Sequence, residues 1–203
     1  MQYLFAVIMG YFLGCSNMAY WVSLAKGVDI RNGGSRNLGA SNVTILLGWK
    51  AGVIVGLHDI GKAAAAVFLA KLLFPELEYA PTAAGTACVM GHIFPFYLKF
   101  KGGKGLASFL GAVAVLNWKL GIALAILLVL VTLVTDFIVL GTLSVSVAAP
   151  IGIWLMTGKL IAALILCFAA AVMAFKHKEN VKRILNRTEI GLRSAAKGEN
   201  RIK

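Results

Sequence analysis

A short run of lysines and glycines, Lys101-Gly102-Gly103-Lys104-Gly105, carries the clearest chemical signal in the chain. Glycines let successive backbone N–H groups turn toward one point and form an anion-binding concavity, and lysines add positive charge. An apolar segment begins at Leu106, so the N-terminus of its helix would favour an anion at the same place. The run therefore indicates a phosphate site. The alternative is a loop whose lysines only follow the excess of positive charge on the cytoplasmic side of membrane proteins.

His92 lies shortly before this run, near the end of the preceding apolar segment. An imidazole at that place can donate a hydrogen bond to a phosphate or act as an acid or base. It can equally be a histidine packed between helices, which for a single histidine is the commoner case. The nearby Phe94, Phe96, Tyr97 and Phe100 are typical of an aromatic belt at a membrane interface.

A second polar cluster spans residues 33–42, with the sequence GGSRNLGASN. It has two hydroxyls, two amides, one guanidinium and three glycines, and it contains no acid. Such a segment supplies neutral hydrogen-bond donors and tight turns for a polar, anionic or carbonyl-bearing ligand. The alternative is a turn-rich connector in which Ser41 or Asn42 caps a short helix around residues 43–49.

A third cluster follows the last apolar segment, where His177, Asn180 and Arg183 are spaced three apart. On a helix that continues this segment the three side chains would share one face. Four further bases, Lys176, Lys178, Lys182 and Arg187, are expected at lipid headgroups, and Glu189 is able to pair with one of these four. The alternative, a basic membrane-anchoring tail, explains the lysines fully but His177 and Asn180 less well.

Three further polar residues, His58, Asp59 and Lys62, lie inside an apolar segment. Charges at membrane depth are costly and are usually functional or paired. Because Asp59 and Lys62 are three apart, they can neutralise each other on one helix face. We expect a structural pair that supports the loops, and a proton or ion path is the alternative. Asp136, at the start of another apolar segment, is a candidate helix N-cap.

The composition is that of a polytopic membrane protein. The chain has 203 residues, of which 60% are hydrophobic and 14% charged, and its mean hydropathy is +0.85. A soluble domain is nearer to half apolar and a quarter charged. We expect one transmembrane domain, residues 1–203. The net charge of +12 is attributed to cytoplasmic loops, anionic lipid and an anionic substrate rather than to nucleic acid.

The apolar segments predict an all-α fold with about seven transmembrane helices. The fourth and fifth of these segments are short and are expected to be tilted or to line a cavity. The three cysteines lie inside apolar segments without metal or redox spacing. Because the acidic residues are also scattered along the chain, we expect no metal site. The predicted spans are 3–24, 51–74, 82–98, 105–117, 120–135, 137–156 and 160–175.

The basic residues predict the orientation of the chain in the membrane. With seven spans, 16 of the 20 lysines and arginines fall on one side, including Lys197, Arg201 and Lys203 near the C-terminus. Three fall on the other side, namely Lys71, Lys119 and Lys159, and Lys62 lies within a span. The positive-inside rule then puts the N-terminus outside and the C-terminus in the cytoplasm.

In order along the chain, the three clusters resemble the motifs SGNxGATN, GHxFPxxxxFKGGKG and HxxNxxRLxxGTE of the bacterial acyl-phosphate:glycerol-3-phosphate acyltransferases, the PlsY family. The resemblance covers nearly the whole chain. It implies transfer of an acyl group from acyl-phosphate to the 1-hydroxyl of glycerol 3-phosphate, giving lysophosphatidic acid and phosphate, the first acylation of phospholipid biosynthesis. It also implies a multi-pass protein of the bacterial cytoplasmic (inner) membrane with its active site at the cytoplasmic face, and no cofactor.

Carried over by position, the resemblance implies roles for individual residues. Glu189 joins Asp59 and Lys62 as a structural residue. The expected catalytic residues are Ser35, Lys104, His177 and Asn180, and the expected substrate-binding residues are Arg36, Asn37, Ser41, Asn42, His92, Lys101, Gly102, Gly103 and Arg183.

The chain departs from the family pattern at several positions. Arg36 and Arg187 stand where glycine is usual, and Ser41 stands for threonine and keeps the hydroxyl. Ile45 occupies a position where many members have an arginine. We hypothesise that Arg36 replaces this missing cation.

The sequence offers no persuasive serine–histidine–acid or cysteine–histidine constellation. We therefore expect direct attack by the glycerol hydroxyl, with a substrate phosphate oxygen or His177 as the base. An acyl-enzyme on Ser35 is the less favoured route.

The competing functional class is a small membrane transporter of a phosphorylated solute, which should have polar residues along a path to both faces. A third class is a non-catalytic membrane scaffold, which would not need three glycine- and amide-rich loops. Here the polar clusters gather on one face.

Overall fold

The computed structural model describes residues 1–196, and this part of the chain forms helices and turns without strands. Three basic residues that enter the charge count, Lys197, Arg201 and Lys203, lie outside the described residues. The helices in chain order, with η marking a 3₁₀-helix, are α1 (Gln2–Cys15), α2 (Met18–Ala25), η1 (Ile30–Asn32), α3 (Ala40–Leu47), α4 (Trp49–Leu73), α5 (Ala80–Ile93), η2 (Phe96–Leu98), α6 (Leu106–Leu116), α7 (Trp118–Thr135), α8 (Ile138–Thr157), α9 (Leu160–Lys176), α10 (Lys178–Leu185) and α11 (Leu192–Ala196).

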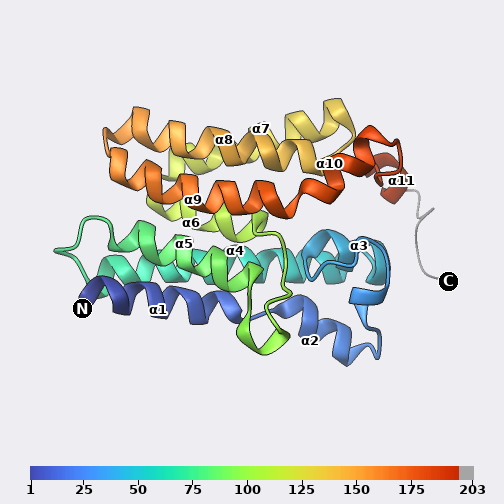
Figure 1. The fold of residues 1–203 in the computed structure, drawn as a ribbon, viewed down its shortest axis with the longest axis horizontal. Helices are drawn as coiled ribbons and strands as arrows, with labels where there is room; N and C mark the ends of the chain where they lie inside the picture. Colours follow the sequence, from blue (N-terminus) through green and yellow to red (C-terminus); the bar gives the residue numbers. More distant parts are fainter. Residues whose placement is uncertain (197–203) are drawn as a thin grey trace.

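The long helices form a bundle along the long axis of the molecule, as Figure 1 shows. Helix α1 packs on α5, α4 on α5 and α6, and α8 on both α7 and α9. Glycines allow the closest of these approaches, because a Cβ atom at Gly10 or Gly14 of α1 would collide with the backbone of α5 at Ala84 or Cys88. The all-helical prediction is thus confirmed.

Each of the seven predicted spans is mainly helical, but fewer than seven helices are long enough to cross a bilayer. Residues 2–25, α4, α7 and α8 are four candidate spans, and α9 with α10 would form a fifth that bends by 47°. Helix α6 has only 11 residues, which is about 16 Å of helix against a hydrocarbon core of about 30 Å. The described residues therefore contain four to five candidate spans by length and composition.

Two predicted spans differ from the helices in detail. The segment 3–24 breaks at Ser16, where Asn17 accepts a hydrogen bond from Tyr20 N at 2.9 Å and starts a new helix. The segment 82–98 ends as a helix at Ile93. Pro95 explains this end, because proline has no N–H and disfavours helical geometry in the residue before it.

The polar segments gather at the end of the bundle opposite to the N-terminus. Figure 1 shows α3, α10 and α11 at this end. The N-cap predicted at Asp136 is wrong, and the alternative that placed a cap at Ser41 or Asn42 does not hold either. Asp136 ends α7 with a left-handed φ of 68°, and Phe137 precedes α8. Helix α3 starts after Gly39, so neither Ser41 nor Asn42 is its cap.

Candidate active site

A cavity of about 520 Å³ lies at the polar end of the bundle and is lined by segments that are far apart in the sequence. The first polar cluster, the start of α6, the start of α8 and the chain from His177 to Ile190 all contribute. The polar residues in its lining are Ser35, Arg36, Asn37, Ser41, Asp59, His92, Lys104, Thr142, His177, Asn180, Arg183, Thr188 and Glu189.

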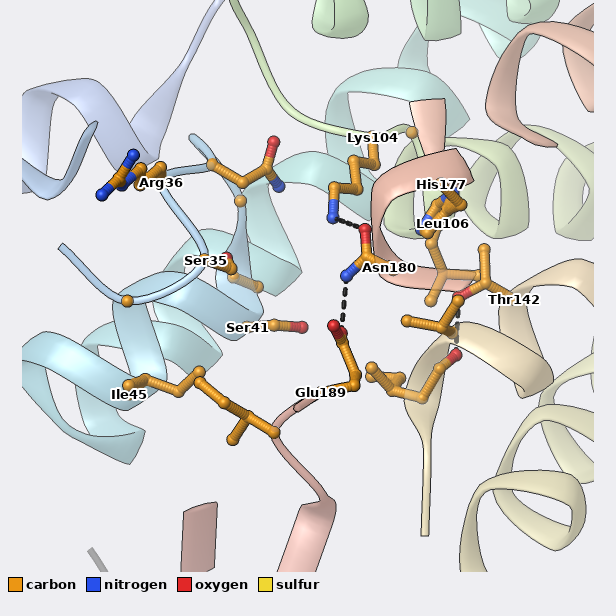
Figure 2. A pocket seen from close by; sticks show the side chains of 18 of the residues that line it. Ser35, Arg36, Ser41, Ile45, Lys104, Leu106, Thr142, His177, Asn180 and Glu189 are labelled. Carbon is orange, nitrogen blue, oxygen red and sulfur yellow. Dashed lines mark hydrogen bonds between the residues drawn. The ribbon is translucent and has the colours of Figure 1, made fainter. Parts of the chain in front are cut away.

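Lys104 reaches into this cavity from the residue pair that precedes α6. Gly105 has a left-handed φ of 97°, which lets the chain turn sharply into the helix. Figure 2 shows the Lys104 side chain directed at Asn180, and its Nζ donates a hydrogen bond to Asn180 Oδ1. Burial lowers the pKa of Lys104 to about 8, although the Glu189 carboxylate acts in the opposite direction. The ammonium group therefore remains mostly charged at neutral pH.

Asn180 is in turn held by Glu189. Its Nδ2 donates to Glu189 Oε1 at 2.6 Å, and Arg183 Nε donates to Glu189 Oε2, also at 2.6 Å. The Glu189 side chain is 9% exposed and that of Arg183 is 38% exposed. Lys104, Asn180, Glu189 and Arg183 thus form one chain of hydrogen bonds along the cavity. Glu189 pairs with Arg183 and not with one of the four bases that were predicted as its partner, Lys176, Lys178, Lys182 and Arg187.

His177 lies at the bend between α9 and α10 and is buried. Its Nδ1 is 2.8 Å from the carbonyl oxygen of Met173. A carbonyl oxygen only accepts hydrogen bonds, so Nδ1 carries the hydrogen and Nε2 of the neutral ring is left as an acceptor. A base at this position would therefore act through Nε2.

The first polar cluster is shaped around the buried side chain of Asn42. Asn42 Oδ1 accepts from Ser35 N at 2.8 Å, and Asn42 Nδ2 donates to the carbonyl oxygens of Ile30 at 2.8 Å and Gly33 at 3.3 Å. Asn42 itself does not line the cavity, whereas Ser35, Asn37 and Ser41 do. The structure thus gives Asn42 the task of holding the loop that presents these three side chains.

The glycines of the lysine–glycine run fold back onto the end of α5. Gly102 N donates to Ile93 O and Gly103 N donates to His92 O, each at 3.0 Å. These N–H groups are engaged, and neither glycine lines the cavity. Lys101 is exposed and also lies outside the lining. From this run only Lys104 and Gly105 line the cavity, and they are followed by Leu106 and Ala107 in the first turn of α6.

A buried network of charges packs against the lysine–glycine run that precedes α6. Lys62 Nζ is 2.7 Å from Asp59 Oδ1, 2.9 Å from His92 Nδ1 and 2.7 Å from the carbonyl oxygen of Ser16, where α1 breaks. The predicted Asp59–Lys62 pair is confirmed. The Nε2 side of the His92 ring abuts Gly103, where a Cβ atom would collide with it. The network therefore links α4, the break after α1 and the loop before Lys104.

One arrangement of a serine, a histidine and an acid escaped the sequence analysis. Ser16 Oγ is 2.8 Å from His58 Nε2, and His58 Nδ1 is 3.6 Å from Asp59 Oδ1. The second distance is too long for a hydrogen bond. Neither Ser16 nor His58 lines the cavity. The contact closes the break between α1 and α2 and gives no support to nucleophilic catalysis.

Arg36 lines the cavity from the loop opposite Lys104 and has a left-handed φ of 55°. Its side chain points away from Lys104 and Asn180, and Ile45 lies across the loop from it (Figure 2). Arg187, the other arginine at a position where the family pattern has glycine, has a φ of 58° and does not line the cavity. Both positions thus have the backbone geometry that glycine adopts without strain.

Sequence reasoning missed the contribution of α8, whose Ile138, Val139 and Thr142 line the cavity. It also missed Ile190. The signal in α8 is weak, because Thr142 is one of four hydroxyl residues in this apolar helix. Its hydroxyl donates to Ile138 O at 2.8 Å. These residues give the cavity an apolar side next to its row of charges.

The fold and the motifs agree with known proteins. The family model for glycerol-3-phosphate acyltransferase matches residues 4–187. Relatives named glycerol-3-phosphate acyltransferase include one from Oceanobacillus iheyensis, which is 38% identical over 202 residues, 96% of this chain and 97% of that protein. One from Myxococcus xanthus is 38% identical over 187 residues, 90% of this chain and 96% of that protein.

Crystal structures of PlsY (YgiH), an integral membrane glycerol 3-phosphate acyltransferase, have a similar fold. The glycerol 3-phosphate form has a TM-score of 0.89 at 30% identity and covers 94% of this chain and 96% of its own. The lysophosphatidic acid form has a TM-score of 0.87 at 29% identity and covers 97% and 99%. The chain is therefore a multi-pass integral membrane protein and belongs to the glycerol-3-phosphate acyltransferase family.

Proposed function

We propose that this chain transfers an acyl group from an acyl-phosphate to the 1-hydroxyl of glycerol 3-phosphate and releases lysophosphatidic acid and phosphate. The observation that carries the proposal is the row from Lys104 through Asn180 to Glu189, which sets an ammonium group at a helix N-terminus inside a cavity. A phosphate beside Lys104 would also face the first N–H groups of α6, which lack partners within the helix. In the living cell this reaction would be the first acylation of phospholipid biosynthesis.

The reaction forms one carbon–oxygen bond and breaks another. The hydroxyl oxygen of glycerol 3-phosphate attacks the acyl carbon, the bond from that carbon to the bridging oxygen breaks, and phosphate leaves with the electron pair. Since the leaving group is good, the site needs mainly to position both substrates and to stabilise the developing negative charge. Lys104 and the start of α6 line the cavity and would supply that stabilisation. Arg36 also lines the cavity and would contribute once its side chain turns toward Lys104.

The hydroxyl proton has two possible acceptors. One is an oxygen of a substrate phosphate, and the other is Nε2 of His177, which the bond from Nδ1 to Met173 leaves free. Ser35 would be the nucleophile of an acyl-enzyme route. The described histidines bond to Ser16, Lys62 and Met173, and none of them hydrogen-bonds to the Ser35 hydroxyl. Direct attack is therefore the favoured route, and an acylated Ser35 peptide found by mass spectrometry would contradict it.

We further propose that residues 1–203 act as one transmembrane domain with seven crossings, an outer N-terminus and a cytoplasmic C-terminus and active site. The seven helices α1 and α4 to α9 alternate in direction along the bundle, which supports an odd number of crossings (Figure 1). A cysteine introduced at Lys159 should react with a membrane-impermeant maleimide in intact cells. A cysteine introduced at Lys182 should react only after permeabilisation, and the opposite pattern would reverse the orientation.

The direct test is to mix purified protein with palmitoyl-phosphate and glycerol 3-phosphate and to measure released phosphate and lysophosphatidic acid. We expect stoichiometric formation of both products. Lys104→Ala should abolish most of it, because the cavity loses the cation that Asn180 positions. Lys119→Ala, at an exposed lysine in the first turn of α7, is the matched control and should keep full activity. Acylation with acyl-CoA but not with acyl-phosphate would contradict the proposed donor.

A further inference from the structure

The segment after α10 crosses from that helix to the turn between α7 and α8. We name residues 188–193 the strap. Its first part, Thr188, Glu189 and Ile190, lines the cavity. Its last part meets Asp136, the residue that ends α7. The match to the family model ends at residue 187. Thr188 and Glu189 still belong to the third family motif, whereas residues 190–193 follow it.

Asp136 clasps the far end of the strap through both its backbone and its side chain. Leu192 N donates to Asp136 O at 2.8 Å, and Arg193 N donates to Asp136 Oδ1 at 2.9 Å. Arg193 Nη2 also donates to Leu133 O at 3.2 Å. The Arg193 guanidinium is exposed and lies 3.8 Å from the carboxylate, so this ion pair adds little. The two backbone N–H bonds are what fix the strap.

The fit between the strap and Asp136 is close. Asp136 has a left-handed φ of 68°, which turns its carbonyl and carboxylate toward the strap. A Cβ atom at Gly191 would collide with the Asp136 carboxylate. The strap is thus tethered at two places. Glu189 binds Asn180 and Arg183 at one end, and residues 191–193 bind Asp136 at the other.

We propose that Asp136 is a positioning residue for the reaction. By clasping residues 191–193 it holds Glu189 against Asn180 and Arg183, and Asn180 in turn sets the position of the Lys104 ammonium group. Asp136 is not part of the cavity lining, so it acts only through the strap. Without Asp136, residues 191–193 would be untethered. Glu189 could then bind Asn180 and Arg183 only if the strap is ordered each time, which costs conformational entropy. This inference rests on the acyl transfer proposed above.

The first test compares Asp136→Gly with Asp136→Asn in the full-length protein. Glycine adopts the left-handed backbone of this turn without strain and removes the carboxylate. We expect kcat/KM for glycerol 3-phosphate to fall on the order of tenfold, mainly through a higher KM, because Lys104 loses its fixed position. Asparagine keeps an oxygen that can accept from Arg193 N, so it should restore nearly wild-type values. Asp29→Ala, which removes an exposed carboxylate bound to Arg31, should change nothing.

Two double variants distinguish positioning from a general loss of structure. Gly191→Ala should lower kcat/KM because its Cβ displaces the Asp136 carboxylate, and Asp136→Gly/Gly191→Ala should be no worse than Asp136→Gly alone. If Asp136 acts through Glu189, adding Asp136→Gly to Glu189→Gln should cause no further loss. Losses that multiply in the Glu189→Gln background would overturn the proposal.

Amide hydrogen exchange supplies a readout that does not depend on activity. In Asp136→Gly the amide of Arg193, which loses its acceptor, should exchange faster. The amides of α4 and α5 should stay protected and show that the fold is intact. If Asp136→Gly shows this faster exchange but keeps wild-type kinetics, Asp136 is not a positioning residue, while the proposed acyl transfer still stands. A wild-type protein that transfers no acyl group at all would overturn the proposed function together with it.

Discussion

Lys104 and Asn180 meet across the cavity, where the ammonium group of one donates a hydrogen bond to the side-chain oxygen of the other. Lys104 stands before α6, and Asn180 lies in α10 after the last long apolar helix. The contact therefore joins the lysine–glycine run to the third polar cluster. A glycerol phosphate held there would touch both, and changes at either residue should affect the same substrate.

The pKa of Lys104 predicts how activity depends on pH. Burial lowers this pKa to about 8, so the side chain is cationic below pH 8 and loses its charge as the pH rises through that value. If the cation binds phosphate, kcat/KM for glycerol 3-phosphate should fall about tenfold for each pH unit well above 8. Steady-state assays between pH 6.5 and pH 10 would measure this decline of kcat/KM.

Lys104→Arg is the matched control for the pH profile. An arginine keeps its charge throughout this range, although its planar fork does not reproduce the ammonium geometry. We expect lower activity at neutral pH and no decline on the alkaline side. A decline in the variant at the same pH as in the wild type would assign the titration to another group.

Gly103→Ala should weaken glycerol 3-phosphate binding without touching the substrate. The new Cβ atom would collide with His92 Nε2 and press on Leu38 O, so the loop before Lys104 must shift. We expect KM to rise on the order of tenfold or more, because misplacement of a positioning group by about 1 Å is costly.

Gly61→Ala is the control for this substitution. A Cβ atom at Gly61, in the middle of α4, would meet open space, and alanine favours helix. Kinetics should be unchanged, and the melting temperature in detergent should be equal or higher. Equal KM values for the two alanine variants would show that the loop tolerates the collision.

Arg36→Gly should separate stability from activity. Relief of the left-handed backbone at φ 55° should stabilise the fold by on the order of 1 kcal/mol. If Arg36 replaces the arginine missing at Ile45, as hypothesised, activity should nevertheless fall, since the cavity lining loses a cation. Arg36→Ala should lower activity without the gain in stability. Thermal unfolding and steady-state kinetics on both variants test the two effects separately.

Arg187→Gly is the companion experiment. Arg187 has a φ of 58° and does not line the cavity. We expect the same gain in stability and unchanged kinetics. Unchanged kinetics in Arg36→Ala as well would remove the idea that Arg36 replaces the missing cation.

The sequence predicted the helical fold because apolar runs with few charges have one structural solution in a bilayer. It also predicted that the three polar clusters meet, because they follow segments that end on one side. Arg36 and Arg187 show what a family pattern adds. The glycines usual at these positions indicate a left-handed backbone, and the structure has that backbone under arginine side chains.

The features of the site that were not predicted depend on tertiary contacts, which leave little trace in a sequence. The Gly102 and Gly103 amides bond to the end of α5 rather than facing the cavity, and glycine content alone does not distinguish the two. Asp136 was expected to cap α8 and instead ends α7 and clasps the strap. Its residue type indicates a helix end, but which of two adjacent helices it serves depends on one backbone angle.

The buried pair of Asp59 and Lys62 yields the last prediction. The two side chains are 3% and 4% exposed and 2.7 Å apart. Lys62→Met would leave a buried carboxylate without its main cation, and loss of one partner of a buried pair costs about 3–5 kcal/mol. We therefore expect a much lower melting temperature in detergent for Lys62→Met. Asp59→Asn/Lys62→Met removes both charges and should recover a large part of the loss.

His92 makes the same experiment informative about the site. Its Nδ1 lies 2.9 Å from Lys62 Nζ and 3.3 Å from Asp59 Oδ1, and its other side abuts Gly103. If the pair serves only to fill the bundle, the neutral double variant should regain both stability and KM. If it also orients His92, stability should return while KM for glycerol 3-phosphate stays raised, because the ring that supports the loop before Lys104 has lost its partners. A double variant as unstable as Lys62→Met would contradict the premise that the unpaired charge causes the loss.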